Sequence, residues 1–104
     1  MANKFIFWKG YSKESRYEAL DKINQIINRS GDVVDVKQFS DISMSLRIEV
    51  EEQKIEKLYL DLKNYIELDD FDILESSTNS ERTLFLNISF SLGKGNIEVA
   101  VPYV

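Results

Sequence analysis

Two stretches of the chain alternate apolar and polar residues, and this alternation constrains the fold more than any other feature. Between Ser43 and Val50 every second residue is apolar, and the stretch from Leu84 to Leu92 repeats the pattern with Phe85 as an extra apolar residue. Successive side chains of a strand point to opposite faces of a sheet, so each stretch is predicted to be a strand with one buried face. A second layer must then cover that face.

Two segments with helical periodicity can supply that layer. Ser15 and Glu18 have the spacing of a capping box, in which each side chain accepts a hydrogen bond from the other residue's backbone amide. The second helix is predicted to have Glu51 and Glu52 in its first turn, where free amides favour negative charge, and to end near Tyr65. Both helices carry one apolar stripe, formed by Ala19, Leu20, Ile23, Ile26 and Ile27 in the first and by Ile55, Leu58, Tyr59 and Leu62 in the second.

Together with the stretch 43–50, three further apolar segments are predicted to be strands, namely residues 5–8, 33–39 and 71–75. They are followed by a predicted hairpin at 82–102 with its turn at 93–96.

The order of elements predicts one α+β domain over residues 1–104. Right-handed crossovers place both helices on one face of an antiparallel sheet. The expected fold is a ferredoxin-like βαββαβ sandwich with its core in residues 4–75 and an extra C-terminal β-hairpin at 82–102. The other face of the sheet has no helix to cover it.

Composition excludes several kinds of chemistry. The 104 residues include no histidine and no cysteine, which removes imidazole-dependent catalytic triads, thiol nucleophiles, disulfides and thiolate or imidazole metal sites. Carboxylate pairs can be drawn from 18 acidic residues in many ways, so they carry no information about acid–base catalysis. We expect no enzymatic activity and no cofactor.

Charge and hydropathy bear on location and partners. The net charge of −5 argues against a nucleic-acid partner, because such binding depends on Lys and Arg. The apolar run at residues 5–8 is too short for a secretory signal or a membrane span, so we expect a cytoplasmic protein without a membrane partner. Residues 1–30 nevertheless carry six basic and three acidic side chains.

Residues 5–75 resemble an ACT-type domain, a small ligand-sensing regulatory module. The resemblance lies in a strand that ends at Gly10, an amphipathic helix, the segments 31–41 and 44–52, and a second helix with leucines at its centre. It is one of pattern and element order. In that family the loop after the first strand helps to bind a small effector, usually at a dimer interface, and the matching positions are Gly10, Tyr11 and Ser12. This chain departs from the pattern in the polar segment 12–15.

The first candidate site is the loop expected between the first strand and the first helix. A flexible glycine, three cations and free amides at a helix N-terminus could hold a small anion, although the same residues also suit an ordinary capped turn. The candidate ligand-binding residues are Lys9, Gly10, Tyr11, Ser12, Lys13 and Arg16.

The uncovered sheet face is the second candidate, as a protein interface. Large apolar groups among polar ones indicate a partner surface, and a two-fold contact is its commonest use, although scattered surface hydrophobic residues are common as well. Val33, Phe39 and Phe85 are expected there, with either Phe5 and Phe7 or Ile6 and Trp8 from the first strand.

An acidic stretch is the third feature. Residues 67–70 are predicted to form a turn, and with Asp72 and Glu75 they make an acidic surface that could meet a basic partner. A calcium site is disfavoured, because the spacing does not match an EF-hand loop.

These features favour a non-catalytic regulatory or ligand-binding module that acts as a homodimer. The alternative is a stand-alone interaction module, such as an inhibitor or immunity protein, that uses its acidic surface.

Overall fold

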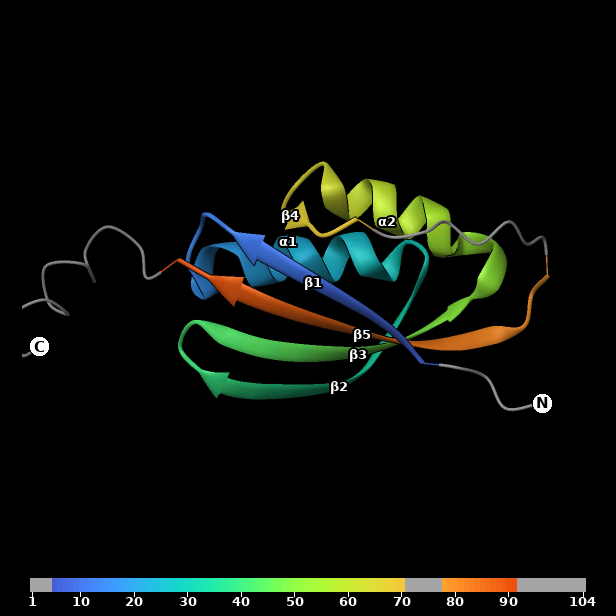
Figure 1. The fold of residues 1–104 in the computed structure, drawn as a ribbon, viewed down its shortest axis with the longest axis horizontal. Helices are drawn as coiled ribbons and strands as arrows, with labels where there is room; N and C mark the ends of the chain where they lie inside the picture. The colour runs from blue at the N-terminus through green and yellow to red at the C-terminus, as the bar shows by residue number, and fades with distance from the viewer. Residues whose placement is uncertain (1–4, 71–77, 92–104) are drawn as a thin grey trace, which may run out of the picture.

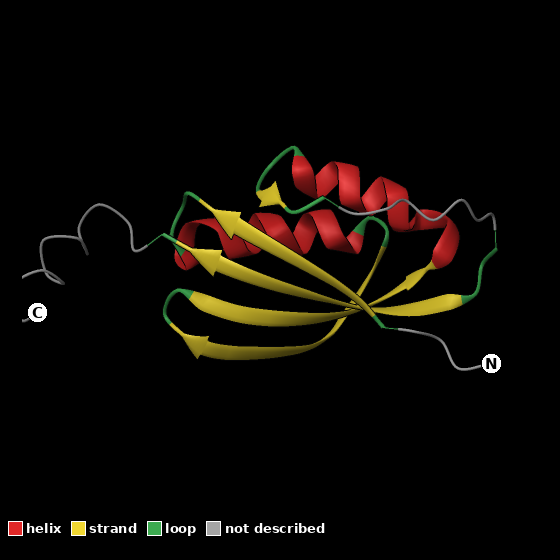
Figure 2. Ribbon diagram, viewed as in Figure 1, coloured by secondary structure: helices red, strands yellow, loops and turns green. Residues whose placement is uncertain are grey.

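The two alternating stretches pair with each other at the centre of a five-stranded sheet. In the computed structural model, which describes residues 5–70 and 78–91, Leu46 lies opposite Leu86 in this antiparallel pair. The two helices lie together on one face of the sheet (Figures 1 and 2). The elements are β1 (Ile6–Ser12), α1 (Arg16–Asn28), β2 (Gly31–Ser40), β3 (Ser43–Glu51), the 3₁₀ turn η1 (Glu52–Lys54), α2 (Ile55–Lys63), β4 (Glu67–Leu68) and β5 (Glu81–Phe90).

The strand order corrects the expected sheet. The order is β2-β3-β5-β1-β4, and β5 runs parallel to β1 while the other neighbouring pairs are antiparallel. The expected antiparallel sheet is therefore a mixed one, and residues 81–90 form its middle strand instead of one arm of an added hairpin. The reason is burial, because the inward face of β5 is apolar from Leu84 to Phe90 and a central strand is covered best. The other arm of the expected hairpin lies outside the described residues.

The short strand β4 stands where the sequence predicts an acidic turn. Leu68 lies opposite Gly10 of β1 in an antiparallel pair. A Cβ at Gly10 would lie 3.1 Å from the Leu68 side chain and 3.2 Å from the Glu67 carbonyl oxygen. The glycine therefore allows the close approach of β4 to β1. The strand predicted at 71–75 lies outside the described residues.

The position of α1 and the buried stripes of both helices agree with the prediction, but the start of α2 does not. Glu51 ends β3, Glu52 belongs to η1, and α2 begins at Ile55, because the inward alternation of β3 continues to Val50. The Ser15 hydroxyl accepts a hydrogen bond from the Glu18 amide, and the Glu18 carboxylate accepts one from the Ser15 amide, so the capping box is confirmed. The apolar stripes of both helices pack on the inward faces of β1, β3 and β5. None of the helices in the described part of the chain is long and apolar enough to span a membrane.

A polar cluster fixes the start of β5 to the end of β3. The Arg82 guanidinium lies 2.5 Å from the Glu52 carboxylate, and both side chains are mostly buried. The Thr78 hydroxyl donates to the same carboxylate at 2.9 Å, and the Glu52 amide donates to the Ser80 carbonyl at 2.8 Å. These contacts hold the strand that enters between β1 and β3.

Candidate functional site

A cavity of about 320 Å³ lies between the end of β1 and the turn that joins α2 to β4. Residues 11–14 line one side and residues 63–67 the other. Two lysines, Lys13 and Lys63, and two acids, Glu14 and Glu67, are among the residues that line it. We name it the Lys13/Lys63 cavity. It contains three of the candidate ligand-binding residues, Tyr11, Ser12 and Lys13.

The ion pairs around this cavity are long and exposed. The Lys13 ammonium lies 4.0 Å from the Glu67 carboxylate, and the Lys63 ammonium lies 4.0 Å from the Asp70 carboxylate. Exposed pairs of this kind contribute only about 0–1 kcal/mol. A bound anion can therefore replace either ion pair at little cost, and to reach the cavity the Lys63 ammonium must also leave the Tyr59 hydroxyl.

The structure places the other candidate residues differently from the expected loop. β1 continues to Ser12, so Lys9 and Tyr11 point to the open sheet face while Gly10 and Ser12 are buried. Gly10 is correspondingly a tightly packed strand residue and not a flexible loop residue. Lys9, Gly10 and Tyr11 line a second pocket of about 280 Å³, next to β4.

Arg16 lies apart from the two pockets. Its guanidinium stacks 4.5 Å from the centre of the Tyr17 ring and lies 3.8 Å from the Asp41 carboxylate. Arg16 therefore belongs to the packing of α1 and is not among the residues that line either pocket.

The N-terminus of α1 is already occupied by acidic side chains of the chain itself. Glu18 completes the capping box, and Glu14 accepts a hydrogen bond from the Tyr65 hydroxyl. This hydrogen bond, together with burial and the charges of Glu14 and Glu18, raises the pKa of Tyr65 to about 12. The phenol stays protonated at neutral pH, and the two lysines are the positively charged residues of this cavity that can hold an anion.

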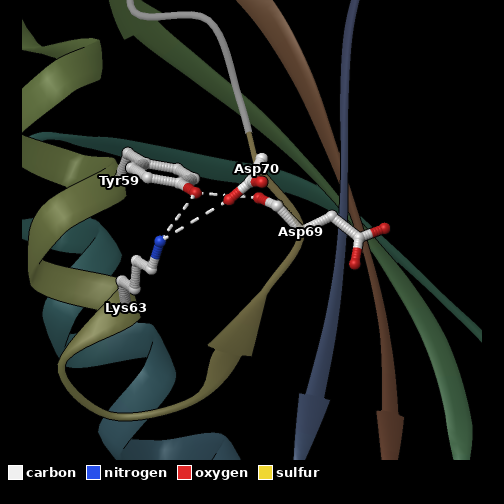
Figure 3. A network of polar contacts seen from close by, with 4 residues as sticks. All are labelled: Tyr59, Lys63, Asp69 and Asp70. Atoms are coloured by element: carbon white, nitrogen blue, oxygen red, sulfur yellow. Dashed lines mark hydrogen bonds and ion pairs between the residues drawn. The ribbon is translucent and has the colours of Figure 1, made fainter.

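The acidic stretch is tied to α2 by a small network, shown in Figure 3. The Tyr59 hydroxyl donates to the Asp69 carbonyl at 2.8 Å, and the Lys63 ammonium donates to the Tyr59 hydroxyl at 3.5 Å. The same ammonium faces the Asp70 carboxylate (Figure 3). Within residues 5–70 and 78–91, no group of three or more acidic side chains is placed to hold a metal ion. Asp72 and Glu75 lie outside the described residues.

Three phenylalanines cluster on the open face of the sheet. The Phe7 and Phe85 rings are stacked with centres 5.3 Å apart, and the Phe5 ring meets Phe85 edge-on at 5.5 Å. Phe5 is 59% exposed and Phe7 64% exposed. The structure thus decides the open question of the first strand: Phe5 and Phe7 lie on the open face, while Ile6 and Trp8 are buried beneath the helices.

One of the expected interface residues lies on the other face. Val33 lies opposite the buried Ile48 and packs against the core, so its assignment to the open face is wrong. A bulge between Val33 and Asp35 reverses the alternation of β2, which the sequence pattern did not reveal. Phe39 is exposed, and Phe85 lies on the open face as expected.

Sequence reasoning missed the α2 side of the cavity, namely Lys63 and Tyr65. A usable signal was the element order, because α2 runs back along the sheet after β3 and ends beside the end of β1. It also missed Arg47, which with Asp35, Lys37, Ser45 and Phe85 lines a shallow open-face pocket of about 200 Å³.

Comparison with known proteins leaves the chain without an assigned family. No protein-family model matches it, and neither a curated protein nor a solved structure shows significant similarity to it.

Proposed function

We propose that this protein is a non-catalytic, homodimeric binding module that holds a small anionic ligand in the Lys13/Lys63 cavity. The observation that carries the proposal is the meeting of two lysines from distant parts of the chain at one cavity of about 320 Å³. That volume falls within the usual range of ligand sites. A ligand with a carboxylate or phosphate group could bridge Lys13 and Lys63.

Tyr65 is not suited to act as a general base in the cavity. A general base must be able to lose its proton near the working pH. Tyr65 has the opposite property, because its hydrogen bond to Glu14 raises its pKa. A regulatory role of the ACT type and a cytoplasmic location are part of the proposal, the location resting on the cysteine-free sequence.

The test is a nuclear magnetic resonance titration of the full chain with inorganic phosphate, with glycine as a zwitterionic comparator. We expect saturable shifts of amides in residues 11–14 and 63–67 at millimolar ligand. The variants Lys13→Gln and Lys63→Gln should each weaken the response several-fold. Lys54→Gln is the matched control, because Lys54 is exposed and lies outside the residues that line the cavity. Absence of a localised response in the wild type would overturn the ligand site.

A second candidate function is that of an inhibitor or immunity-type module. The observation that favours it is the exposed acidic run Glu67, Asp69 and Asp70, in which the Asp70 side chain is fully exposed. Binding to the product of a neighbouring gene should weaken with added salt and with the double variant Asp69→Asn/Asp70→Asn. Binding that is insensitive to both would exclude this role for the acidic run.

A further inference from the structure

We infer that the open sheet face binds a second copy of the chain through a two-fold axis that runs along β5. This inference rests on the dimer of the proposed function and adds its interface and its axis. It starts from one cross-strand row, in which Arg47 lies opposite Phe85 and Phe85 lies opposite Phe7. Phe85 is the middle of that row.

Under this axis, the side chains of the row in one copy meet side chains of complementary chemistry in the same row of the second copy. Rotation about β5 leaves Phe85 facing Phe85 and places β3 of one copy over β1 of the other. Each Arg47 then meets the Phe7 ring of the second copy. Guanidinium groups bind the faces of aromatic rings. One face of the Phe7 ring stacks on Phe85, and because the ring is 64% exposed its other face is available for this contact.

The next row gives a second match, on the outer strands. Lys37 lies opposite Ser45, Ser45 opposite Asn87, and Asn87 opposite Lys9. Beyond Lys9, the Asp69 amide donates to the Lys9 carbonyl at 3.0 Å. The same axis places Lys37 over Asp69 of the second copy, because both residues lie two strands away from β5.

Asp69 belongs to the open face, as this match requires. It lines a surface pocket of about 250 Å³ together with Lys9, Phe7 and Asn87. In Figure 3 its carboxylate points away from Tyr59 and Lys63, while its backbone carbonyl faces Tyr59. The carboxylate is therefore free of the α2 network.

A two-fold axis across the strands is disfavoured by charge. If it passed through this row, it would place Arg47 over Arg47 and Asp35 over Asp35, since these residues lie opposite each other within one chain. Like charges in contact are repulsive. The axis along β5 pairs unlike groups in the Arg47 and Lys37 rows, and its one like pair on that strand, Glu81 over Glu81, lies at the end of β5.

The face is large enough for a specific dimer. Four strands about 4.8 Å apart, with about nine residues of about 3.3 Å each, present roughly 600 Å² per copy. The total of about 1,200 Å² is at the lower limit of stable specific interfaces. We therefore expect a dimer of modest affinity.

The balance of charge favours a second copy over a nucleic acid. Exposed rings on a sheet can also stack with the bases of a single strand. Here the open face carries three cations, Lys9, Lys37 and Arg47, and a larger number of acids, and the whole chain carries −5. The acids of that face are Asp32, Asp35, Glu49, Glu51, Glu67, Asp69 and Glu81. This excess of acidic side chains repels the phosphates of a nucleic acid, whereas a second copy brings cations of its own that can pair with them.

The experiment is sedimentation velocity on the full chain over a range of concentrations. The variants are F7K, R47E and the double variant F7K/R47E, with K54E as the matched control and circular dichroism as the check of folding. F7K should place the new lysine against Arg47 of the second copy, and R47E should place the new glutamate against the Phe7 ring of the second copy. Each variant should therefore weaken dimerisation about tenfold or more. In the double variant the new cation and anion face each other across the axis, and dimerisation should return to within a few-fold of the wild type.

Each outcome decides a specific point. Rescue by the double variant supports the axis, because β5 separates β1 from β3 within one chain. A dimer that none of the variants weakens overturns this interface and leaves the dimer of the proposed function standing. A wild type that stays monomeric overturns both the dimer and its interface, while the ligand site is judged by its own titration. If the wild type is a monomer that binds a fluorescent oligothymidylate, and the Phe7→Ser variant does not bind it, the face is a base-stacking surface instead.

Discussion

Leu86 is the residue whose truncation tests the central position of β5 most directly. It is fully buried and lies between Leu46 of β3 and Trp8 of β1. Leu86→Ala removes three carbons, which costs about 2.4 kcal/mol at about 0.8 kcal/mol per methylene. The cavity left behind raises the expected loss of unfolding free energy to about 3–5 kcal/mol.

This loss is large for a domain of this size. Small domains have an unfolding free energy of about 5–15 kcal/mol, so the variant should lose a substantial part of its stability. Urea unfolding followed by circular dichroism should show a lower midpoint with an unchanged slope. In thermal unfolding we expect the midpoint to fall by more than about 12 °C.

Leu60→Ala is the matched control. Leu60 lies on α2 and is 50% exposed, so the same truncation there should cost less than about 1 kcal/mol. A strand added outside the core would tolerate Leu86→Ala almost as well as α2 tolerates Leu60→Ala. Equal small losses in the two variants would therefore refute the placement of β5 between β1 and β3.

Three further predictions concern the backbone, an ion pair and a phenol. Gly31→Ala places a Cβ 2.6 Å from a carbonyl oxygen of β3 and should lower the free energy of unfolding in urea by about 1–3 kcal/mol. An unchanged urea midpoint would contradict the close approach of Gly31 to β3. Arg82→Met leaves the mostly buried Glu52 carboxylate without its guanidinium partner and should lower the free energy of unfolding by about 2–4 kcal/mol in the same assay. A loss below about 1 kcal/mol would show that the ion pair is dispensable. Tyr65 should ionise near pH 12, as an ultraviolet difference titration against Tyr65→Phe would show, and Glu14→Gln should return its pKa toward 10.0. Because its pKa is raised in the folded state, its contribution to stability is complete below about pH 10 and is lost as the pH rises toward 12.

Local patterns predicted what depends on neighbouring residues in the chain. The capping box at Ser15, the buried stripe of α1 and the hairpin of β2 and β3 all follow from short-range spacing and agree with the structure. The candidate residues Tyr11 and Lys13 also proved to line a cavity. Such features are predictable because a helix or a strand fixes the direction of its side chains by its own geometry.

Other features depended on what the segment packs against. The bulge between Val33 and Asp35, one of two register shifts in β2, puts Val33 on the helix-covered face, because one extra residue reverses the alternation across it. Gly10 resembled a turn glycine, but its role is to let Leu68 approach β1. Neither the bulge nor the approach of β4 has a signal in the residues next to it.

The alternation at 84–92 by itself determined that residues 81–90 form a half-buried strand with Phe85 on the polar side. Only the tertiary structure decided that this strand enters between β1 and β3, parallel to the first and antiparallel to the second. The physical reason is that alternation reports which side of a strand is buried but not which strands lie beside it. The pairing of strands depends on the burial that the assembled sheet and helices achieve together. This pairing places Arg47, Phe85 and Phe7 in one row.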